Sequence, residues 1–246
     1  MYINSRAINL MCLMAEHGFV TSNEIEKYIM TDRSCRRYFN VLNELELMDS
    51  FETYMRPKTA YYLTDAGYKC LESMGKLIVS KRFVKSDYRL MRFSHTVLGL
   101  QIRLIFQKHP WVVDYRPEKV VAYYHELHAS KDEVKRKAKQ CDAEMIVKAP
   151  KGEYKTGVEI ELTLKSFKRL TGAIKSIDIN RDDLNVVLWV ASSETIISNL
   201  QSAIKILLPH LRNPDKHLFA LWNDLNTKQL NTVWCNAEGY KTKLFD

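Results

Sequence analysis

Two carboxylates and an ammonium group are predicted to share one face of a strand near the middle of the chain. Glu159, Glu161 and Lys165 alternate with apolar residues, and a period of two places such side chains on the same side of a strand. Asp142 opens the preceding predicted strand. Carboxylate oxygens suit Mg²⁺ or Mn²⁺, and a bound divalent cation polarises a phosphodiester and lowers the pKa of an attacking water. The candidate metal ligands are therefore Asp142, Glu159 and Glu161, with Lys165 stabilising charge that develops on the phosphate.

The same side chains also have a plainer explanation. On a strand face exposed to solvent, Glu159 and Glu161 would pair with Lys165, Lys168 or Arg169. Surface ion pairs of this kind are common and contribute little to stability. The spacing leaves both alternatives open, a divalent-metal site and an ordinary acid–base network.

Basic residues gather at a second place, the start of a predicted helix near the N-terminus and the tip of the hairpin after it. Residues 1–80 hold nine lysines and arginines against ten acidic residues, and five of the nine fall at these two positions. Arginines and polar side chains so placed can contact base edges and phosphates. The candidate DNA contacts are Arg33, Ser34, Arg36, Arg37, Tyr38, Asn40, Arg56 and Lys58.

The elements that must position the candidate DNA contacts follow from hydrophobic periodicity and helix capping. The sequence predicts helices over 6–17, 22–30 and 32–48, strands over 51–55 and 59–63, and a helix from 65 to about 74. Gly18 is expected to end the first helix. Thr21 or Ser22 caps the second helix, Asp32 the third and Thr64 the last.

This order of elements resembles winged helix-turn-helix regulators across residues 1–78, including a strand that ends at Leu63-Thr64 with Gly67 three residues later. The resemblance implies that the third helix enters the major groove of double-stranded DNA, with Arg56 and Lys58 on the wing against the phosphate backbone. A winged helix can also be a protein-interaction module, and a charged helix start can be a solvated face. Both alternatives stay open.

A polar and basic connection over 79–89 is predicted to separate this domain from a second one over 90–246. We expect helices over 90–108, 167–179 and 195–208, and strands or extended segments over 111–115, 120–128, 141–147, 157–165, 185–190 and 217–222. Strands alternating with helices favour a mixed sheet flanked by helices. The expected fold class is α+β, a winged helix-turn-helix domain followed by an α/β domain.

Over about residues 90–225 the chain resembles the PD-(D/E)xK nuclease-like superfamily, in which an aspartate, a glutamate on the following strand and a lysine two residues later form the site. By position these are Asp142 and Glu159, with Glu161 where the lysine usually stands. Lys165 is the candidate for a relocated lysine. The resemblance implies either an inactive nuclease-like domain or, as the alternative, an endonuclease dependent on Mg²⁺ or Mn²⁺.

Most of the chain is also similar to the replication-relaxation family of plasmids and integrative elements. The similarity rests on the N-terminal domain, on Ser94-His95-Thr96 in a helix, on the Asp-Ala pair at Asp142, and on the segment 158–165. It implies a sequence-specific DNA-binding protein of a mobile element, acting in replication, mobilisation or transcriptional control beside replication or mobilisation proteins. A homodimer is expected, because many winged-helix proteins bind two half-sites.

Bulk composition agrees with a nucleic-acid partner. The 246 residues include 37 lysines and arginines and 29 acidic residues, a formal net charge of +8, which favours a polyanion. The apolar stretches are far shorter than the ~20 residues of a membrane span, and the N-terminus lacks the apolar core of a signal peptide. We therefore expect a cytoplasmic protein. The five cysteines have neither zinc nor redox spacing.

Overall fold

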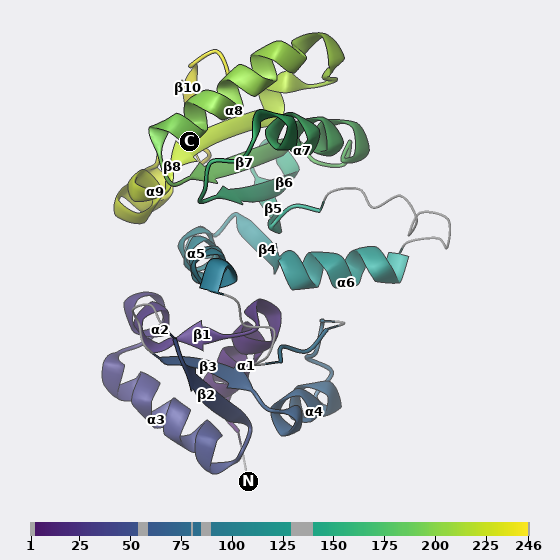
Figure 1. Ribbon diagram of the computed structural model, residues 1–246. Helices are drawn as coiled ribbons and strands as arrows, with labels where there is room; N and C mark the ends of the chain where they lie inside the picture. The colour runs from purple at the N-terminus through teal and green to yellow at the C-terminus, as the bar shows by residue number, and fades with distance from the viewer. Residues whose placement is uncertain (1–2, 54–58, 80, 85–89, 129–139, 246) are drawn as a thin grey trace. The chain divides into compact units, whose positions relative to one another are not determined.

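The structure is a computed structural model that describes residues 3–53, 59–79, 81–84, 90–128 and 140–245. Helices and strands are mixed, as the predicted α+β class requires (Figure 1). The chain divides into two compact units. Unit 1 holds Met1–Leu104 with Ala122–Tyr124, and unit 2 holds Ile105–Val121 with His125–Asp246.

Unit 1 combines a small antiparallel sheet with helices. Its elements are α1 (Ser5–His17), β1 (Val20–Thr21), α2 (Ser22–Tyr28), α3 (Asp32–Glu44), β2 (Met48–Glu52), β3 (Thr59–Leu63), α4 (Asp65–Ser73) and most of α5 (Leu90–Phe106). The three strands pair in the order β1-β3-β2. The predicted helices and the hairpin are present, while the short β1 was not predicted.

Local capping explains several boundaries in unit 1. Gly18 ends α1 with a positive φ of 95° and an N–H that donates to the carbonyl of Met14, a conformation that favours glycine. The Thr64 side chain accepts from the N–H of Gly67 at 3.1 Å and so caps α4 as predicted. A Cβ at Gly67 would lie 2.1 Å from the carbonyl oxygen of Leu47, which explains the glycine in the first turn of α4.

The prediction for the third helix was wrong in its N-cap residue and in its C-terminal end. Thr31 occupies the N-cap position and Asp32 is the first helical residue, so Asp32 does not cap α3. The helix ends at Glu44, and Glu46 adopts a positive φ of 57° before Met48 begins β2. The apolar residues expected in the last helical turns therefore belong to a turn and a strand, where Leu47 and Met48 are still buried.

The predicted linker and domain boundary also need correction, because the segment after α4 packs into unit 1. Phe83 contacts Phe19 and Phe51 with ring centroids 5.9 and 6.0 Å apart. Phe93 of α5 stacks on Phe19 at 5.3 Å. These four rings form an aromatic cluster, so residues placed in a linker over 79–89 and in a second domain from 90 contribute to the core of unit 1.

Polar contacts hold α5 in unit 1 as well. The guanidinium group of Arg103 pairs with the carboxylate of Glu16, and both side chains are close to fully buried. Gln101 Nε2 donates to Glu24 Oε1 at 2.9 Å. Burial raises the pKa of the Glu24 carboxyl above its ordinary value. Unit 1 therefore extends through Leu104, well past the predicted boundary at residue 78.

Unit 2 is built on the predicted mixed sheet. Its strands are β4 (Val112–Pro117), β5 (Ala143–Ala149), β6 (Gly152–Glu161), β7 (Val186–Ala191), β8 (His217–Leu221), β9 (Trp234–Cys235) and β10 (Lys241–Thr242). They form a seven-stranded sheet in the order β10-β9-β8-β7-β6-β5-β4. The pairs β6–β7 and β7–β8 are parallel and the other pairs antiparallel.

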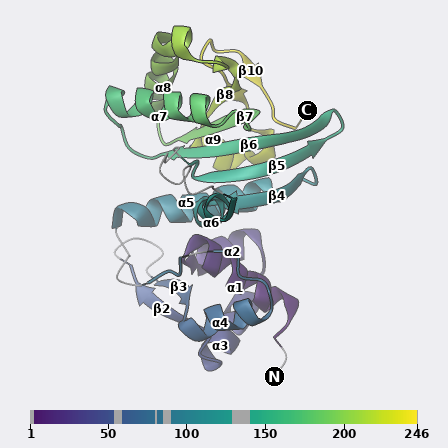
Figure 2. The same ribbon diagram turned by 90° about the vertical axis from the view of Figure 1, so that its right-hand side faces the viewer.

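Helices supply the crossovers that parallel strands require. Helix α7 (Phe167–Asn180) connects β6 to β7, and α8 (Glu194–Leu207) connects β7 to β8. Figure 2 shows α7 and α8 together over one face of the sheet. Helix α9 (Trp222–Lys228) follows β8. The segment 120–128, predicted as extended, is instead part of helix α6 (Glu118–His128), which starts directly after Pro117.

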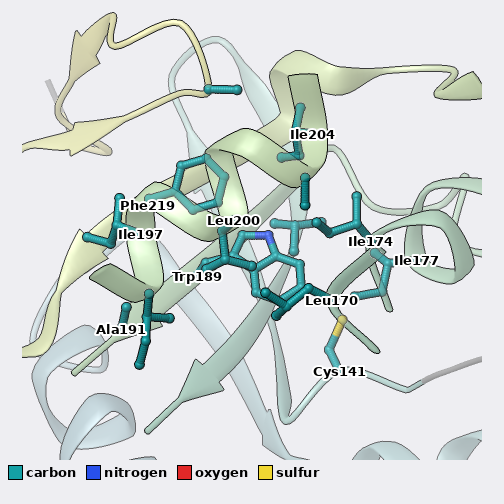
Figure 3. Close-up of a cluster of buried hydrophobic side chains, with 14 of the residues drawn as sticks. Cys141, Leu170, Ile174, Ile177, Trp189, Ala191, Ile197, Leu200, Ile204 and Phe219 are labelled. Atoms are coloured by element: carbon teal, nitrogen blue, oxygen red, sulfur yellow. The ribbon is translucent and has the colours of Figure 1, made fainter. Parts of the chain in front are cut away.

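The core between the sheet and helices α7 and α8 is a cluster of buried apolar side chains (Figure 3). It contains Cys141, Leu170, Ile174, Ile177, Trp189, Ala191, Ile197, Leu200, Ile204 and Phe219. Trp189 of β7 is fully buried there, and its indole Nε1 donates to Nδ1 of His217 at 3.1 Å. Within the described ranges, no helix has the length and apolar character needed to cross a membrane.

Candidate nucleic-acid interface

Helix α3 has one buried side and one exposed side. Cys35, Tyr38, Phe39 and Leu42 recur at helical spacing and face the core of unit 1, as an amphipathic helix requires. Among the predicted DNA contacts, the exposed side carries Arg33, Arg36, Arg37 and Asn40, while Ser34 is half-buried. The structure thus brings four of the predicted contacts onto one solvent-facing surface of one helix.

Tyr38 does not belong to that surface. Its side chain is buried, and its hydroxyl accepts a long hydrogen bond of 3.4 Å from the amide of Asn4. This hydrogen bond lowers the pKa of Tyr38, and the charges of Arg37 and Arg6 lower it further. The guanidinium carbon of Arg37 lies 5.1 Å from the ring centroid. The Tyr38 ring therefore lies against the guanidinium group of Arg37. Because Tyr38 is buried, its side chain is not available for the predicted contact with DNA.

Sequence reasoning missed Asn4 and Arg6, which belong with this side of α3. Asn4 caps α1, since its side chain accepts from the N–H of Ala7 at 3.0 Å. Arg6 is exposed and lies close enough to Tyr38 to influence its pKa. The preference of asparagine for the N-cap position was a usable signal for the first residue. Together Arg6, Arg33 and Arg37 make this the cationic side of α3.

A second row on the exposed side of α3, next to Arg33 and Arg37, carries a paired arginine. Nε and Nη2 of Arg36 donate to the two carboxylate oxygens of Asp32 at 2.7 and 2.6 Å. Both side chains are well exposed, at 76% and 52%, so the pair adds little to stability. Asp32 also stands in the first helical turn, where negative charge is favoured. The pair orients Arg36 without removing it from solvent.

A hollow of about 650 Å³ borders Asp32 and Arg36, between α3, α2 and the hairpin strands. Its lining comprises Ser22, Glu26, Asp32, Cys35, Arg36, Phe39, Asn40, Asn43, Met48, Ser50 and Tyr61. Burial raises the pKa of the Cys35 thiol to about 12, so this cysteine stays protonated and is a poor nucleophile. The amides, hydroxyls and charged groups around the hollow suit hydrogen bonding.

Two of the predicted DNA contacts fall outside the described residues. Arg56 and Lys58 belong to the segment 54–58, which lies between β2 and β3 in the sequence. The interface that can be described therefore consists of α3 and its neighbours.

The candidate metal site in unit 2 differs from its prediction in burial. Glu159 and Glu161 of β6 are each only 1% exposed, so the alternative of a solvent-facing strand was wrong. Lys165 lies beyond the end of β6, and its Nζ reaches back to Glu161 Oε1 at 2.5 Å. Lys165 therefore pairs with Glu161, but it does not share a strand face with Glu159 and Glu161 as predicted, because it is not part of β6.

Asp142 is engaged at a neighbouring position. One of its carboxylate oxygens accepts from the backbone N–H of Ile160 at 2.7 Å, next to Glu159 on β6. Among the residues that the structure describes, however, no three His, Cys, Asp or Glu side chains converge closely enough to hold a metal ion. The geometry therefore does not assemble Asp142, Glu159 and Glu161 into the predicted metal site.

Known proteins offer no guide to this chain. No family model, curated protein or solved structure matches it. The assignment of function consequently rests on the side chains and their arrangement.

A charged network in unit 2 was missed altogether. Glu144 of β5 is buried, and its carboxylate contacts Arg181 Nη2 at 2.6 Å and Lys155 Nζ at 3.0 Å. Asp183 contacts both Arg181 and Lys155. Burial alone raises the pKa of Glu144, but the charges of Arg181 and Lys155 outweigh it and hold that pKa below its ordinary value. Because the two carboxylates are matched by two cations, we interpret these residues as a structural network.

Proposed function

We propose that the chain is a sequence-specific double-stranded-DNA-binding protein that uses unit 1 as a winged helix-turn-helix domain. The observation that carries the proposal is the exposed side of α3, with Arg33, Arg36, Arg37 and Asn40 on a helix whose other side is buried. Helix α2 ends at Tyr28 and α3 begins at Asp32, a connection of the length found in helix-turn-helix motifs. The β2–β3 hairpin that follows supports a wing.

In this proposal the N-terminal half of α3 enters the major groove and the hairpin lies against phosphates. The resemblance to the replication-relaxation family extends the proposal to a mobile element, with a role in replication, mobilisation or transcriptional control. Two half-sites recognised by a homodimer, and replication or mobilisation proteins as partners, belong to the same proposal.

Loss of the cationic side of α3 tests this function. The double variant Arg33→Ala/Arg37→Ala is expected to bind duplex DNA about tenfold more weakly or worse, because phosphate contacts dominate affinity. The slope of log affinity against log salt should fall by about two, roughly one per lost contact. Fluorescence anisotropy with a labelled duplex, repeated over a series of salt concentrations, measures both quantities.

The matched control is Lys69→Ala/Lys76→Ala, which removes two exposed lysines of the same unit outside α3. It should keep the affinity and the salt slope of the wild type within about twofold, since only charges near bound DNA release counterions. Equal losses in the two double variants would show that binding depends on net charge alone. A wild type that binds no duplex at low salt would refute the proposed function.

For unit 2 we propose a nuclease-like domain without catalytic activity. The antiparallel run β4-β5-β6, the crossover helix α7 and the parallel strand β7 support the nuclease-like resemblance, as does Asp142 beside β6. Activity is disfavoured because Glu161 occupies the position of the usual lysine and pairs with Lys165.

Supercoiled plasmid incubated with the protein and Mg²⁺ or Mn²⁺ is therefore expected to remain uncut, as it does with EDTA. Agarose electrophoresis separates supercoiled, nicked and linear forms and so measures cleavage directly. Glu159→Ala serves as the paired variant. Metal-dependent nicking by the wild type that this variant abolishes would replace the proposal with the endonuclease alternative.

A further inference from the structure

We propose that Asp32 and Arg36 act as one recognition unit for a G·C base pair, with Arg36 binding guanine and Asp32 accepting from the amino group of cytosine. The inference rests on the proposed DNA-binding function and names the base pair that α3 recognises. It follows from the contrast between two neighbouring rows of exposed residues on α3.

The side chains along one side of α3 are of the types that pair with base edges in the major groove. Asp32, Arg36 and Asn40 stand at successive i, i+4 positions and all line the hollow, so they form one row along the helix. Arginine binds O6 and N7 of guanine through two hydrogen bonds, aspartate accepts from N4 of cytosine, and asparagine binds adenine. This row is therefore suited to base recognition.

Charge on the same side disfavours phosphate. The hollow is bordered by the carboxylates of Asp32 and Glu26 and by the guanidinium group of Arg36. Two negative charges against one positive charge would repel the DNA backbone, whereas the amino group of cytosine is a hydrogen-bond donor. The adjacent row of exposed residues presents Arg33 and Arg37, with Arg6 nearby, and is suited to phosphate.

The ion pair leaves both partners able to bind a base. Asp32 engages Nε and one N–H of Nη2, so Arg36 keeps both N–H groups of Nη1 and the second one of Nη2. A guanine edge requires two donors. Each oxygen of the Asp32 carboxylate has a further lone pair for an amino group. Because the pair fixes the guanidinium plane, less side-chain entropy is lost on binding.

Selection of binding sites from a random duplex library tests the inference. The wild type is expected to enrich a G·C pair at a fixed position, and replacing that pair with A·T should weaken wild-type binding about tenfold. For Arg36→Lys, which keeps the charge but loses the planar fork, the same replacement should change affinity less than about threefold. Asp32→Asn should enrich the G·C pair less strongly than the wild type, because an amide can donate as well as accept and no longer selects the amino group of cytosine.

Arg33→Lys is the matched control, because it makes the same substitution on the cationic side of α3 and should select the wild-type sequence. Selection of an unchanged sequence by both Arg36→Lys and Asp32→Asn would overturn the inference while leaving the DNA-binding function in place. Binding by the wild type without sequence preference would overturn it in the same way. A wild type that binds no duplex would refute both the inference and the function on which it rests.

Discussion

Replacing Arg181 with methionine is expected to lower the free energy of unfolding of unit 2 by about 3 kcal/mol, since removal of one partner leaves a buried charge uncompensated. The side chains of Arg181 and Glu144 are only 3% and 5% exposed. Their mutual attraction offsets the cost of removing both from water. Without the guanidinium group, the Glu144 carboxylate retains Lys155 as a cationic partner, which places the expected loss at the low end of the usual range for such pairs.

Urea denaturation followed by tryptophan fluorescence measures this loss, because all four tryptophans belong to unit 2. Arg212→Met is the control, as Arg212 pairs with Asp182 at 2.7 Å while both side chains are at least 60% exposed. That variant should cost less than about 1 kcal/mol. The double variant Arg181→Met/Glu144→Gln should recover part of the loss, since it also removes the buried charge. A single variant as stable as the wild type would show that the network is dispensable.

Local rules predicted most elements because their causes are local. Helical spacing and the caps at Gly18 and Thr64 gave α1 and α4 to within a residue or two. The strand–turn–strand pattern gave β3, and compact apolar runs gave β7 and β8. The prediction for the α6 segment failed because β-branched and aromatic residues favour strands only on average, and the tertiary context of a segment can override that preference.

The domain boundary was not predictable from periodicity, because contacts distant in sequence determine it. Phe93 stacks on Phe19, and Arg103 pairs with Glu16, across more than seventy residues. A polar stretch before α5 was a reasonable sign of a linker, but it contains Phe83, which completes the aromatic cluster of unit 1. Such partners are visible only in three dimensions.

Some features of the candidate sites were also predictable from local patterns, whereas others were not. The exposed arginines of α3 were predicted because the polar side of an amphipathic helix follows from its apolar spacing. The burial of Glu159 and Glu161 was not predicted, because the alternation of residues in β6 suggested that one face of the strand is solvated. A strand with a parallel neighbour and crossover helices has both faces covered. The Glu144 network was invisible because its partner Arg181 follows α7, far along the chain.

Unit 2 is also expected to lose stability between pH 6.5 and pH 4 because of His217. Burial lowers the pKa of this imidazole to about 4, with a contribution from the charge of Lys216, which the carboxylate of Asp178 opposes. Its Nδ1 accepts from the indole of Trp189 at 3.1 Å, so the neutral ring is the form that the fold accommodates. The unfolded chain binds a proton at an ordinary pKa near 6.5.

In this window the unfolded state therefore holds more protons than the native state, and stability falls as the pH falls. At pH 5 the loss relative to pH 7 should reach about 2 kcal/mol. The lowered pKa of Glu144 acts only at more acidic pH, because an unfolded glutamate titrates near its ordinary value of about 4.3. Urea denaturation at pH 7, 6 and 5, followed by tryptophan fluorescence, separates the two contributions.

His217→Gln provides the matched variant, because its side-chain oxygen can accept from the Trp189 indole but cannot take up a proton in this range. We expect the pH 5 to pH 7 difference to be about 2 kcal/mol smaller in this variant than in the wild type, whatever the substitution costs at pH 7. An unchanged pH dependence would assign the acid sensitivity to other groups. A reduced one would show that the core beneath α7 and α8 depends on a histidine that must stay neutral.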